Sequence, residues 1–203
     1  MPLINMAAYL PTTEALGPGR RFALWVQGCC FNCPGCVAPA WIPQITNQLI
    51  SAATLAELIR QTPGLEGMTL SGGEPLLQAE SLTALIDAVK LHQPHFTVIC
   101  YTGFRLEELR RDNDPTRLAL LQRLDVLIDG VYRQNQNDDV GLRGSSNQRV
   151  HFLSNVYTEQ AEQFTQASRH IEFHFSGENN VLMVGIPPRQ LPEHFSSFLK
   201  PVL

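Results

Sequence analysis

Short apolar runs that end in glycine recur along this chain and alternate with segments of helical spacing. Four such runs are RFALWVQG (21–28), GMTLSGG (67–73), FTVICYTG (96–103) and DVLIDG (125–130), and they have the length and composition of buried strands. The glycines at their ends mark turns. The pattern predicts four strands, each of which delivers a loop at its carboxyl end.

Apolar residues at helical intervals fill the stretches between these runs. SAATLAELIRQ (51–61) has this spacing and is stopped by a Pro-Gly pair, AESLTALIDAVKLH (79–92) repeats it, and shorter helices are expected at about 105–111 and 115–124. Alternating strands and helices imply βα units and a largely parallel sheet. Because function collects beyond the carboxyl ends of strands in such sheets, the four strand-end loops are expected to share one face.

The last third of the chain has a different pattern. QNQNDDVGLRGSSNQR (134–149) has the composition of a loop, and YTEQAEQFTQASRH (157–170) has helical spacing. IEFHFSGENNVLMVGIPP (171–188) predicts two strands around the turn SGENN. We expect a core domain over 1–155 and a C-terminal α/β extension over 156–203, a helix plus a β-hairpin with no obvious linker.

Composition and charge narrow the class of protein. The chain has 203 residues, 44% of them hydrophobic, which is enough for one domain with a sizeable core. Its net charge of -4 shows no excess of basic residues of the kind that binds nucleic acid. The N-terminus lacks the features of a signal peptide, and no apolar stretch approaches the roughly 18 residues of a membrane span. We therefore expect a cytoplasmic protein without a nucleic-acid or membrane partner.

Four of the five cysteines fall within GCCFNCPGC (28–36). In a reducing compartment, cysteines grouped in this way bind a metal or take part in catalysis more often than they form disulfides. The odd number of cysteines in the chain is also less suited to a set of disulfides. Cys29, Cys33 and Cys36 form C-x3-C-x2-C, whereas Cys30 in place of Cys29 gives C-x2-C-x2-C. Spacing alone leaves both registers open.

The metal that this loop would hold is also open at this stage. Cysteine thiolates hold iron-sulfur clusters, and ferredoxins use similarly tight runs. A structural zinc site closes four positions with Cys or His, but the first histidine after the loop is His92, and ligation by adjacent Cys29 and Cys30 is geometrically awkward. The six histidines show no metal-ligand spacing and read as structural or surface residues. An incomplete iron-sulfur site, a zinc site and inert thiols remain as alternatives.

A second candidate is LSGGEPL (70–76), which puts two glycines and a carboxylate at the end of a predicted strand. Gly72 and Gly73 permit positive φ and let the backbone approach a ligand closely. Backbone carbonyls and Glu74 could accept hydrogen bonds from an ammonium group. The alternative is a tight βα turn in which the carboxylate favours the start of a helix.

Six motifs then follow one another in a recognisable order. They are LGPGRR, GCCFNCPGC, LSGGEPL, YTGF, DVLIDG and LRGSSNQR, within about residues 3–153. In this order they resemble the radical S-adenosylmethionine enzymes and, more closely, the small glycyl-radical-activating proteins of anaerobic ribonucleotide reductase. That resemblance implies an incomplete (β/α) barrel open on one side, since about 150 residues are too few for the roughly 250 of a complete barrel.

The resemblance also implies cofactors, partners and a reaction. A 4Fe-4S cluster would be held by Cys29, Cys33 and Cys36, with its fourth iron open to S-adenosylmethionine and with Cys30 as a non-ligand. An electron from a flavodoxin- or ferredoxin-type donor would cleave S-adenosylmethionine to a 5'-deoxyadenosyl radical. That radical would install a glycyl radical on a partner, the anaerobic ribonucleoside-triphosphate reductase. The cofactors supply this chemistry and the protein supplies ligation and orientation.

Contacts with S-adenosylmethionine are implied for two groups of residues. Gly72, Gly73 and Glu74 would contact the methionine moiety. The backbone of Gly35, Cys36 and Val37 would lie against the adenine. Val37 departs from the family, which usually has an aromatic or other bulky residue at this position.

Two further segments carry roles with alternatives. Asp129 is implied to lie near the cofactor or the substrate peptide, or it caps a strand-end turn. Residues of LRGSSNQR bind the cofactor, help to receive the partner's glycyl loop, or form a structural turn. These residues are Arg143, Ser145, Ser146 and Asn147.

The C-terminal extension leaves the target open. Known activating proteins of this family end soon after the GSSNQ segment, whereas this chain continues for roughly fifty residues. The extension would be a capping hairpin, a dimer contact or a recognition element for another substrate. Two alternatives therefore accompany the main hypothesis: a radical S-adenosylmethionine enzyme that modifies another peptide or small molecule, and a non-enzymatic zinc or iron-sulfur binding module.

Overall fold

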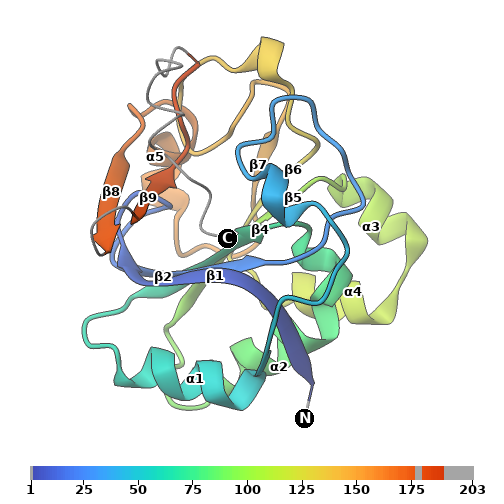
Figure 1. Ribbon diagram of the computed structural model, residues 1–203, viewed down its shortest axis with the longest axis vertical. Helices are drawn as coiled ribbons and strands as arrows, with labels where there is room; N and C mark the ends of the chain where they lie inside the picture. The colour runs from blue at the N-terminus through green and yellow to red at the C-terminus, as the bar shows by residue number, and fades with distance from the viewer. Residues whose placement is uncertain (1, 177–179, 190–203) are drawn as a thin grey trace.

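The computed structural model describes residues 2–176 and 180–189, and its centre is a seven-stranded sheet (Figure 1). The strands are β1 (Leu3–Thr13), β2 (Arg21–Val26), β3 (Gln48–Ser51), β4 (Gly67–Gly72), β5 (Thr97–Thr102), β6 (Val126–Asp129) and β7 (Arg149–Phe152). Their order across the sheet is β3-β1-β2-β4-β5-β6-β7. The strands at the two ends, β3 and β7, do not pair with each other, so the sheet is open.

The main helices connect the strands as the alternation predicted. They are α1 (Ala52–Gln61), α2 (Ala79–Lys90), α3 (Leu106–Asp112) and α4 (Pro115–Leu121), with short 3-10 helices η1 (Pro39–Trp41), η2 (Pro75–Gln78) and η3 (Gln134–Gln136). α1 begins at Ser51, whose hydroxyl accepts a hydrogen bond from the Thr54 N–H, as an N-cap does. None of the helices in the described ranges is long and apolar enough to cross a membrane.

The predicted parallel core is confirmed. β2, β4, β5 and β6 pair in parallel, so their carboxyl ends meet at one edge of the sheet. Three further strands, β1, β3 and β7, pair antiparallel at the flanks and were not predicted. β1 carries register shifts that interrupt its alternation, and β3 and β7 have four residues each, which is too short to give a periodic signal.

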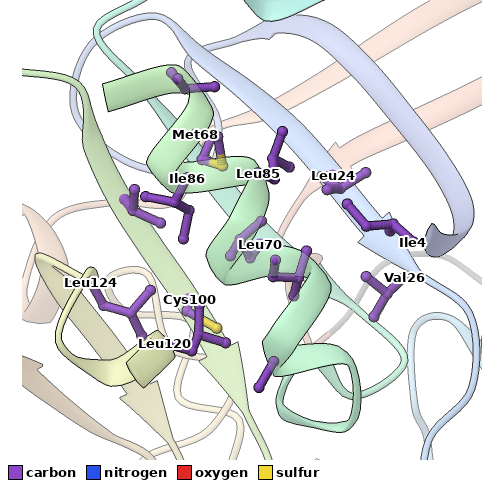
Figure 2. Close-up of a cluster of buried hydrophobic side chains, with 14 of the residues drawn as sticks. Ile4, Leu24, Val26, Met68, Leu70, Leu85, Ile86, Cys100, Leu120 and Leu124 are labelled. Atoms are coloured by element: carbon purple, nitrogen blue, oxygen red, sulfur yellow. The ribbon is translucent and has the colours of Figure 1, made fainter. Parts of the chain in front are cut away.

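One face of the sheet builds the larger core. Phe22, Leu24 and Val26 of β2 point toward α1, α2 and α4 together with alternate residues of β4 and β5. Figure 2 shows Leu85 and Ile86 of α2 over this face, close to Met68 and Leu70. Burial of these side chains supplies the main hydrophobic stabilisation of the fold.

The other face of the sheet is covered by the C-terminal segment. This segment comprises η4 (Thr158–Gln160), α5 (Ala161–Thr165), β8 (Ile171–Ser176) and β9 (Asn180–Gly185). Val184 of β9 packs with Ala23 and Trp25 of β2, and Phe164 of α5 packs with Ile99 of β5. Figure 1 shows α5, β8 and β9 on the side of the sheet away from α1 and α2.

The structure confirms the predicted hairpin but shortens the helix predicted over 157–170. β8 and β9 pair antiparallel around residues 177–179, which lie outside the described part of the chain. The helical residues are only 158–160 and 161–165. Residues 164–169 instead bond to the loop before β7, because the Gly141 N–H donates to the Ala167 carbonyl and the Leu142 N–H donates to the Phe164 carbonyl. This long-range pairing overrides the local periodicity.

Arg21 is fully buried at the start of β2, opposite the strand-end loops. Its guanidinium donates to the hydroxyls of Thr69 (2.8 Å), Thr97 (3.1 Å) and Tyr157 (2.7 Å) and to backbone carbonyls. We expect Arg21→Met to lower the free energy of unfolding by about 3 kcal/mol or more, because several buried acceptors lose their donor. Anaerobic urea unfolding of the apo-protein measures this.

The neighbouring Arg20 provides the control for that experiment. It is exposed, and the hydrogen bonds that the described residues show for it are made by its backbone: its N–H donates to the Glu66 carboxylate (3.1 Å) and its carbonyl accepts from the Glu66 N–H (2.9 Å). Arg20→Met should therefore change the free energy of unfolding by no more than about 0.5 kcal/mol. Equal stability losses in the Arg20 and Arg21 variants would contradict the assigned role of Arg21.

Candidate functional site

The cysteine loop follows β2 and is closed at its base by backbone hydrogen bonds. The Gly28 N–H donates to the Trp41 carbonyl and the Cys29 N–H donates to the Ile42 carbonyl, both at 2.9 Å. Inside the loop the Cys36 N–H donates to the Cys33 carbonyl at 3.1 Å. The loop thus begins and ends on the same part of the sheet edge.

The four thiols of the loop differ in exposure. Cys29, Cys33 and Cys36 are half-buried, whereas Cys30 is exposed, and all four are free. Burial raises the pKa of Cys29 to about 11 and also raises the pKa of Cys36. Without a metal these groups are thiols, so loading a metal must release protons.

The donor set of this loop fits an iron-sulfur cluster. Soft sulfur ligands on a short loop are the ligands that such clusters use. Within residues 2–176 and 180–189, no group of three His, Cys, Asp or Glu side chains is arranged to hold a metal ion. The loop offers the half-buried thiols of Cys29, Cys33 and Cys36 and the exposed thiol of Cys30, which in the described residues are not arranged around a common metal position.

The turn after β4 is joined directly to the cysteine loop. The Gly73 N–H donates to the Val26 carbonyl (2.7 Å) and the Glu74 N–H donates to the Gly28 carbonyl (2.8 Å). A Cβ atom on Gly73 would lie 2.2 Å from the Gly28 carbonyl oxygen, so this position has no room for a side chain. The two motifs that the sequence singled out separately thus form one unit.

The Glu74 carboxylate is 1% exposed and lies between β4 and β5. It accepts hydrogen bonds from the Leu76 N–H (2.9 Å), the Thr102 hydroxyl (2.8 Å) and the Gly103 N–H (2.8 Å). Burial raises its pKa to about 7, against the opposing effect of these donors. The carboxylate therefore joins the GGE turn to the TGF turn, and a cationic group bound nearby would lower its pKa.

This raised pKa predicts a pH dependence of stability. Between pH 4.5 and about 7, native Glu74 keeps a proton that the unfolded chain has lost, so stability falls as pH rises, by about 3 kcal/mol in total. Unfolding of the apo-protein between pH 5 and pH 8 measures the decline. Glu74→Gln should flatten it, because the titrating group is gone.

The exposed Glu80 on α2 is the matched control for the pH experiment. Glu80→Gln should leave the decline as it is in the unmodified chain. If the slope survives in Glu74→Gln, another group causes it and the assignment to Glu74 is wrong. The slope is the readout because the amide of Gln also faces one of the N–H donors, which changes the absolute stability.

Aromatic contacts tie the cysteine loop to the turn after β5. The rings of Phe31 and Phe104 meet edge to face with centroids 4.9 Å apart, and Phe31 also covers Gly103. The Arg117 guanidinium of α4 lies 4.6 Å from the centre of the Phe104 ring. Phe31 lies within the cysteine motif, so the sequence could have marked it as a residue of the site. No sequence pattern marks Arg117, because only the packing of α4 brings it close to Phe104.

Asp129, at the end of β6, is fully buried and surrounded by donors. Its carboxylate accepts hydrogen bonds from Arg105 (3.0 Å), the Leu106 N–H (2.8 Å) and Arg149 (2.7 Å), and His151 Nε2 lies 2.9 Å away. Burial alone would raise its pKa, but the bonds from Arg149 and Leu106 outweigh burial and lower it to about 2. Asp129 thus anchors the start of α3, and a contact with the cofactor stays a prediction.

The loop before β7 reaches back to the cysteine loop. A Cβ atom on Gly35 would lie 2.6 Å from Gln134 Oε1, which shows how closely the two loops approach. The Ser145 hydroxyl is buried and accepts from the Arg133 N–H at 3.1 Å, and the exposed Ser146 donates its N–H to the Gln136 carbonyl at 2.8 Å.

Several polar atoms of this loop are buried without a partner in the described part of the chain. They are Gln136 Oε1, Arg143 Nε and Asn147 Oδ1. Arg143 and Asn147 use other atoms, since Arg143 donates to Asp138 (2.7 Å) and Asn147 donates to the Val131 carbonyl (2.9 Å). Buried polar atoms are normally hydrogen-bonded, so these three have unused capacity for a ligand.

Two further features concern the surroundings of the cysteine loop. Val37 is 62% exposed, so its side chain is not packed in the protein. A cleft of about 550 Å³ beside the base of the cysteine loop is lined by Gln27, Gln44, Gln78 and others, but none of the predicted cofactor residues lines it. The structure otherwise brings the predicted strand-end motifs together at one edge of the sheet.

This arrangement of fold and cysteines places the chain among the iron-sulfur proteins, and residues 15–151 match the family model described as a 4Fe-4S single cluster domain. The chain is 34% identical over 155 residues to the anaerobic ribonucleoside-triphosphate reductase-activating protein of Haemophilus influenzae, covering 73% of this chain and 97% of the relative. It is 33% identical over 151 residues to the protein of the same name from Enterobacteria phage T4, covering 72% of this chain and 93% of the relative. The chain therefore belongs to the family of anaerobic ribonucleoside-triphosphate reductase-activating proteins. Among solved structures, QueE from Escherichia coli aligns with 50% of this chain and 52% of that chain, with a TM-score of 0.40 and 17% sequence identity.

Proposed function

We propose that this protein is a radical S-adenosylmethionine enzyme that installs a glycyl radical on an anaerobic ribonucleoside-triphosphate reductase. The observation that carries the proposal is the hydrogen-bonded unit of cysteine loop and GGE turn, in a chain of the activating-protein family. When bound, the 4Fe-4S cluster and S-adenosylmethionine supply the reductive cleavage and the hydrogen abstraction. The residues of the chain bind, orient and shield these groups.

In this proposal the cluster ligands are Cys29, Cys33 and Cys36, and the exposed Cys30 is not a ligand. With three cysteine ligands and Cys30 not ligating, one coordination position would be left for the cofactor. The residues that would contact S-adenosylmethionine are Gly35, Cys36, Val37, Gly72, Gly73, Glu74, Asp129, Arg143, Ser145, Ser146 and Asn147. Support comes from the contacts that link these loops and from the unused polar atoms of Arg143 and Asn147.

The open sheet supports a partial barrel as the fold of this enzyme. Four parallel strands with their helices on one face would make half of an eight-stranded (β/α) barrel, and β3 and β7, at the two ends of the sheet, do not pair with each other. We propose residues 1–155 as the catalytic unit and 156–203 as an extension. The electron donor would be a flavodoxin or ferredoxin, and the protein would act in the cytoplasm without nucleic-acid or membrane partners.

The extension favours one alternative within the same chemistry. The matches to the curated relatives cover only 71–74% of this chain, and the family-model match ends at residue 151. An added segment that covers one face of the sheet would suit a different peptide or small-molecule substrate. A glycyl-radical enzyme encoded beside this protein would favour the main proposal, and its absence from the whole genome would end it.

Anaerobic reconstitution tests the proposal. The protein is loaded with iron and sulfide, reduced in the presence of S-adenosylmethionine and assayed for 5'-deoxyadenosine. About four iron atoms per chain and formation of 5'-deoxyadenosine are expected. A glycyl radical should then appear by electron paramagnetic resonance when the anaerobic reductase is added. Stoichiometric zinc without cleavage would reject the enzyme and favour a metal-binding module.

A further inference from the structure

We infer that Arg169, in the C-terminal extension, is a positioning residue that holds the loop over residues 137–147 in the conformation needed to bind S-adenosylmethionine. The inference rests on the proposed function. It assigns the extension a role in building the site, in addition to covering one face of the sheet.

Arg169 donates to the loop at several points along its length. Its guanidinium reaches the carbonyls of Arg143 (2.6 Å) and Gly144 (3.4 Å), the Asn137 Oδ1 (2.7 Å) and the Asp139 carboxylate (3.3 Å). The side chain is only 5% exposed, so these bonds form in a largely dry environment. One buried cation thus fixes the loop on both sides of Val140.

The backbone of the residues before Arg169 also forms hydrogen bonds with this loop. The Gly141 N–H donates to Ala167 (2.8 Å) and the Leu142 N–H donates to Phe164 (2.9 Å). A Cβ atom on Gly141, whose φ is +62°, would lie 2.3 Å from the Phe164 carbonyl oxygen, so the approach is very close. The loop and residues 164–169 of the extension therefore form one paired unit.

Asp139 has an unusual backbone conformation that contacts with the extension help to hold. It has a φ of +59°, in the left-handed region that a residue with a side chain rarely adopts. Its carboxylate meets Arg169 and accepts from the Arg189 N–H at 2.6 Å. Such conformations persist where surrounding contacts over-determine them. Here both carboxylate contacts come from the C-terminal segment, and the Asp139 N–H also donates to Asn137 Oδ1 (3.2 Å) within the loop.

The loop offers atoms of Arg143 and Asn147 to a ligand; Arg169 holds Arg143 directly, whereas Asn147 bonds to Arg105 and Val131. Arg143 Nε and Asn147 Oδ1 are buried and unpartnered in the described residues, and Arg169 holds the carbonyl of Arg143 itself. A small polar molecule reaches buried atoms more easily than a protein loop does, which favours S-adenosylmethionine over the partner as the ligand. The contact of Gln134 with Gly35 sets the same loop beside the cysteines.

The test compares Arg169→Ala and Arg169→Lys with Arg110→Ala, a matched control on the exposed side of α3. Hydrogen exchange of the apo-protein measures how often the loop opens. Steady-state cleavage of S-adenosylmethionine by the reconstituted protein measures how well the site binds it. In Arg169→Ala the amides of 141–146 should exchange about tenfold faster or more, because the loop opens locally. The KM for S-adenosylmethionine should rise about tenfold with kcat within about twofold and iron content unchanged, the signature of lost binding.

In Arg169→Lys the exchange rates and the KM should fall between those of the unmodified protein and those of Arg169→Ala, since lysine keeps the charge but cannot span the same acceptors. A lower melting temperature with unchanged exchange over 141–146 and unchanged KM would overturn the inference. If Arg169→Ala does not fold, the lysine variant decides, and unchanged exchange there also overturns it. Absence of 5'-deoxyadenosine from the unmodified protein would instead reject the proposed function, while the exchange data still decide whether Arg169 positions the loop.

Discussion

Single replacement of Cys29, Cys33 or Cys36 by Ala is expected to abolish stable cluster binding and S-adenosylmethionine cleavage. Each variant keeps only two of the three assigned ligands of a cluster that would have one iron open to the cofactor. All three thiols are half-buried on one loop. Iron and sulfide content, the visible absorption of the reconstituted protein and 5'-deoxyadenosine formation measure the effect.

The adjacent Cys30 is the internal control for this prediction. It is the exposed thiol of the loop, and Cys30→Ala should retain both the iron and the cleavage. The control is well matched because the same atom is removed one residue away. Loss of the cluster in Cys30→Ala together with its survival in Cys29→Ala would show that the ligands follow C-x2-C-x2-C.

Gly73→Ala is expected to disrupt the site almost as severely. The added methyl group would lie 2.2 Å from the Gly28 carbonyl oxygen and 2.9 Å from the Trp41 carbonyl oxygen, and backbone atoms cannot swing aside as a side chain does. The GGE turn and the cysteine loop must then separate, which breaks the bonds from Gly73 to Val26 and from Glu74 to Gly28. We expect most of the iron to be lost and stability to fall by about 1–3 kcal/mol.

Gly64→Ala separates this effect from general destabilisation. Gly64 follows α1, far along the chain from the cysteines, and has a φ of +73°. Alanine there should cost about 1 kcal/mol through backbone strain, with the iron content intact. A Gly73→Ala protein that binds iron and cleaves S-adenosylmethionine as well as Gly64→Ala does would contradict the proposed joint between the two loops.

These two predictions use the part of the site that the sequence could reveal. The cysteine spacing and the GGE turn are local patterns, and the strand-helix alternation places both at one edge of a parallel sheet. The sequence could not show that Glu74 bonds to the turn after β5, because that contact depends on how two strands pair. Nor could it show Arg149 and His151 beside Asp129, since β7 is too short to predict.

In the C-terminal segment, too, one part of the structure was predictable from the sequence and another part was not. Its hairpin was predictable because alternating residues and a turn are local signals, but the helix expected over 157–170 is confined to 158–165. The helix ends at Thr165, and the Phe164 and Ala167 carbonyls accept hydrogen bonds from the loop before β7 in place of helical ones. Tertiary contacts override local propensity where they bury more surface and satisfy more backbone groups.

The sequence by itself indicated the class of chemistry through six motifs whose order resembles the activating-protein family, whereas the cysteine spacing alone left the metal and the register open. Only the tertiary structure decided which residues support them. Arg21, Glu74 and Arg169 each act on groups far away in the chain, and their roles exist only because folding buries them beside those groups. A buried charge or carboxylate must find its partners in space, and no local pattern records which partners those are.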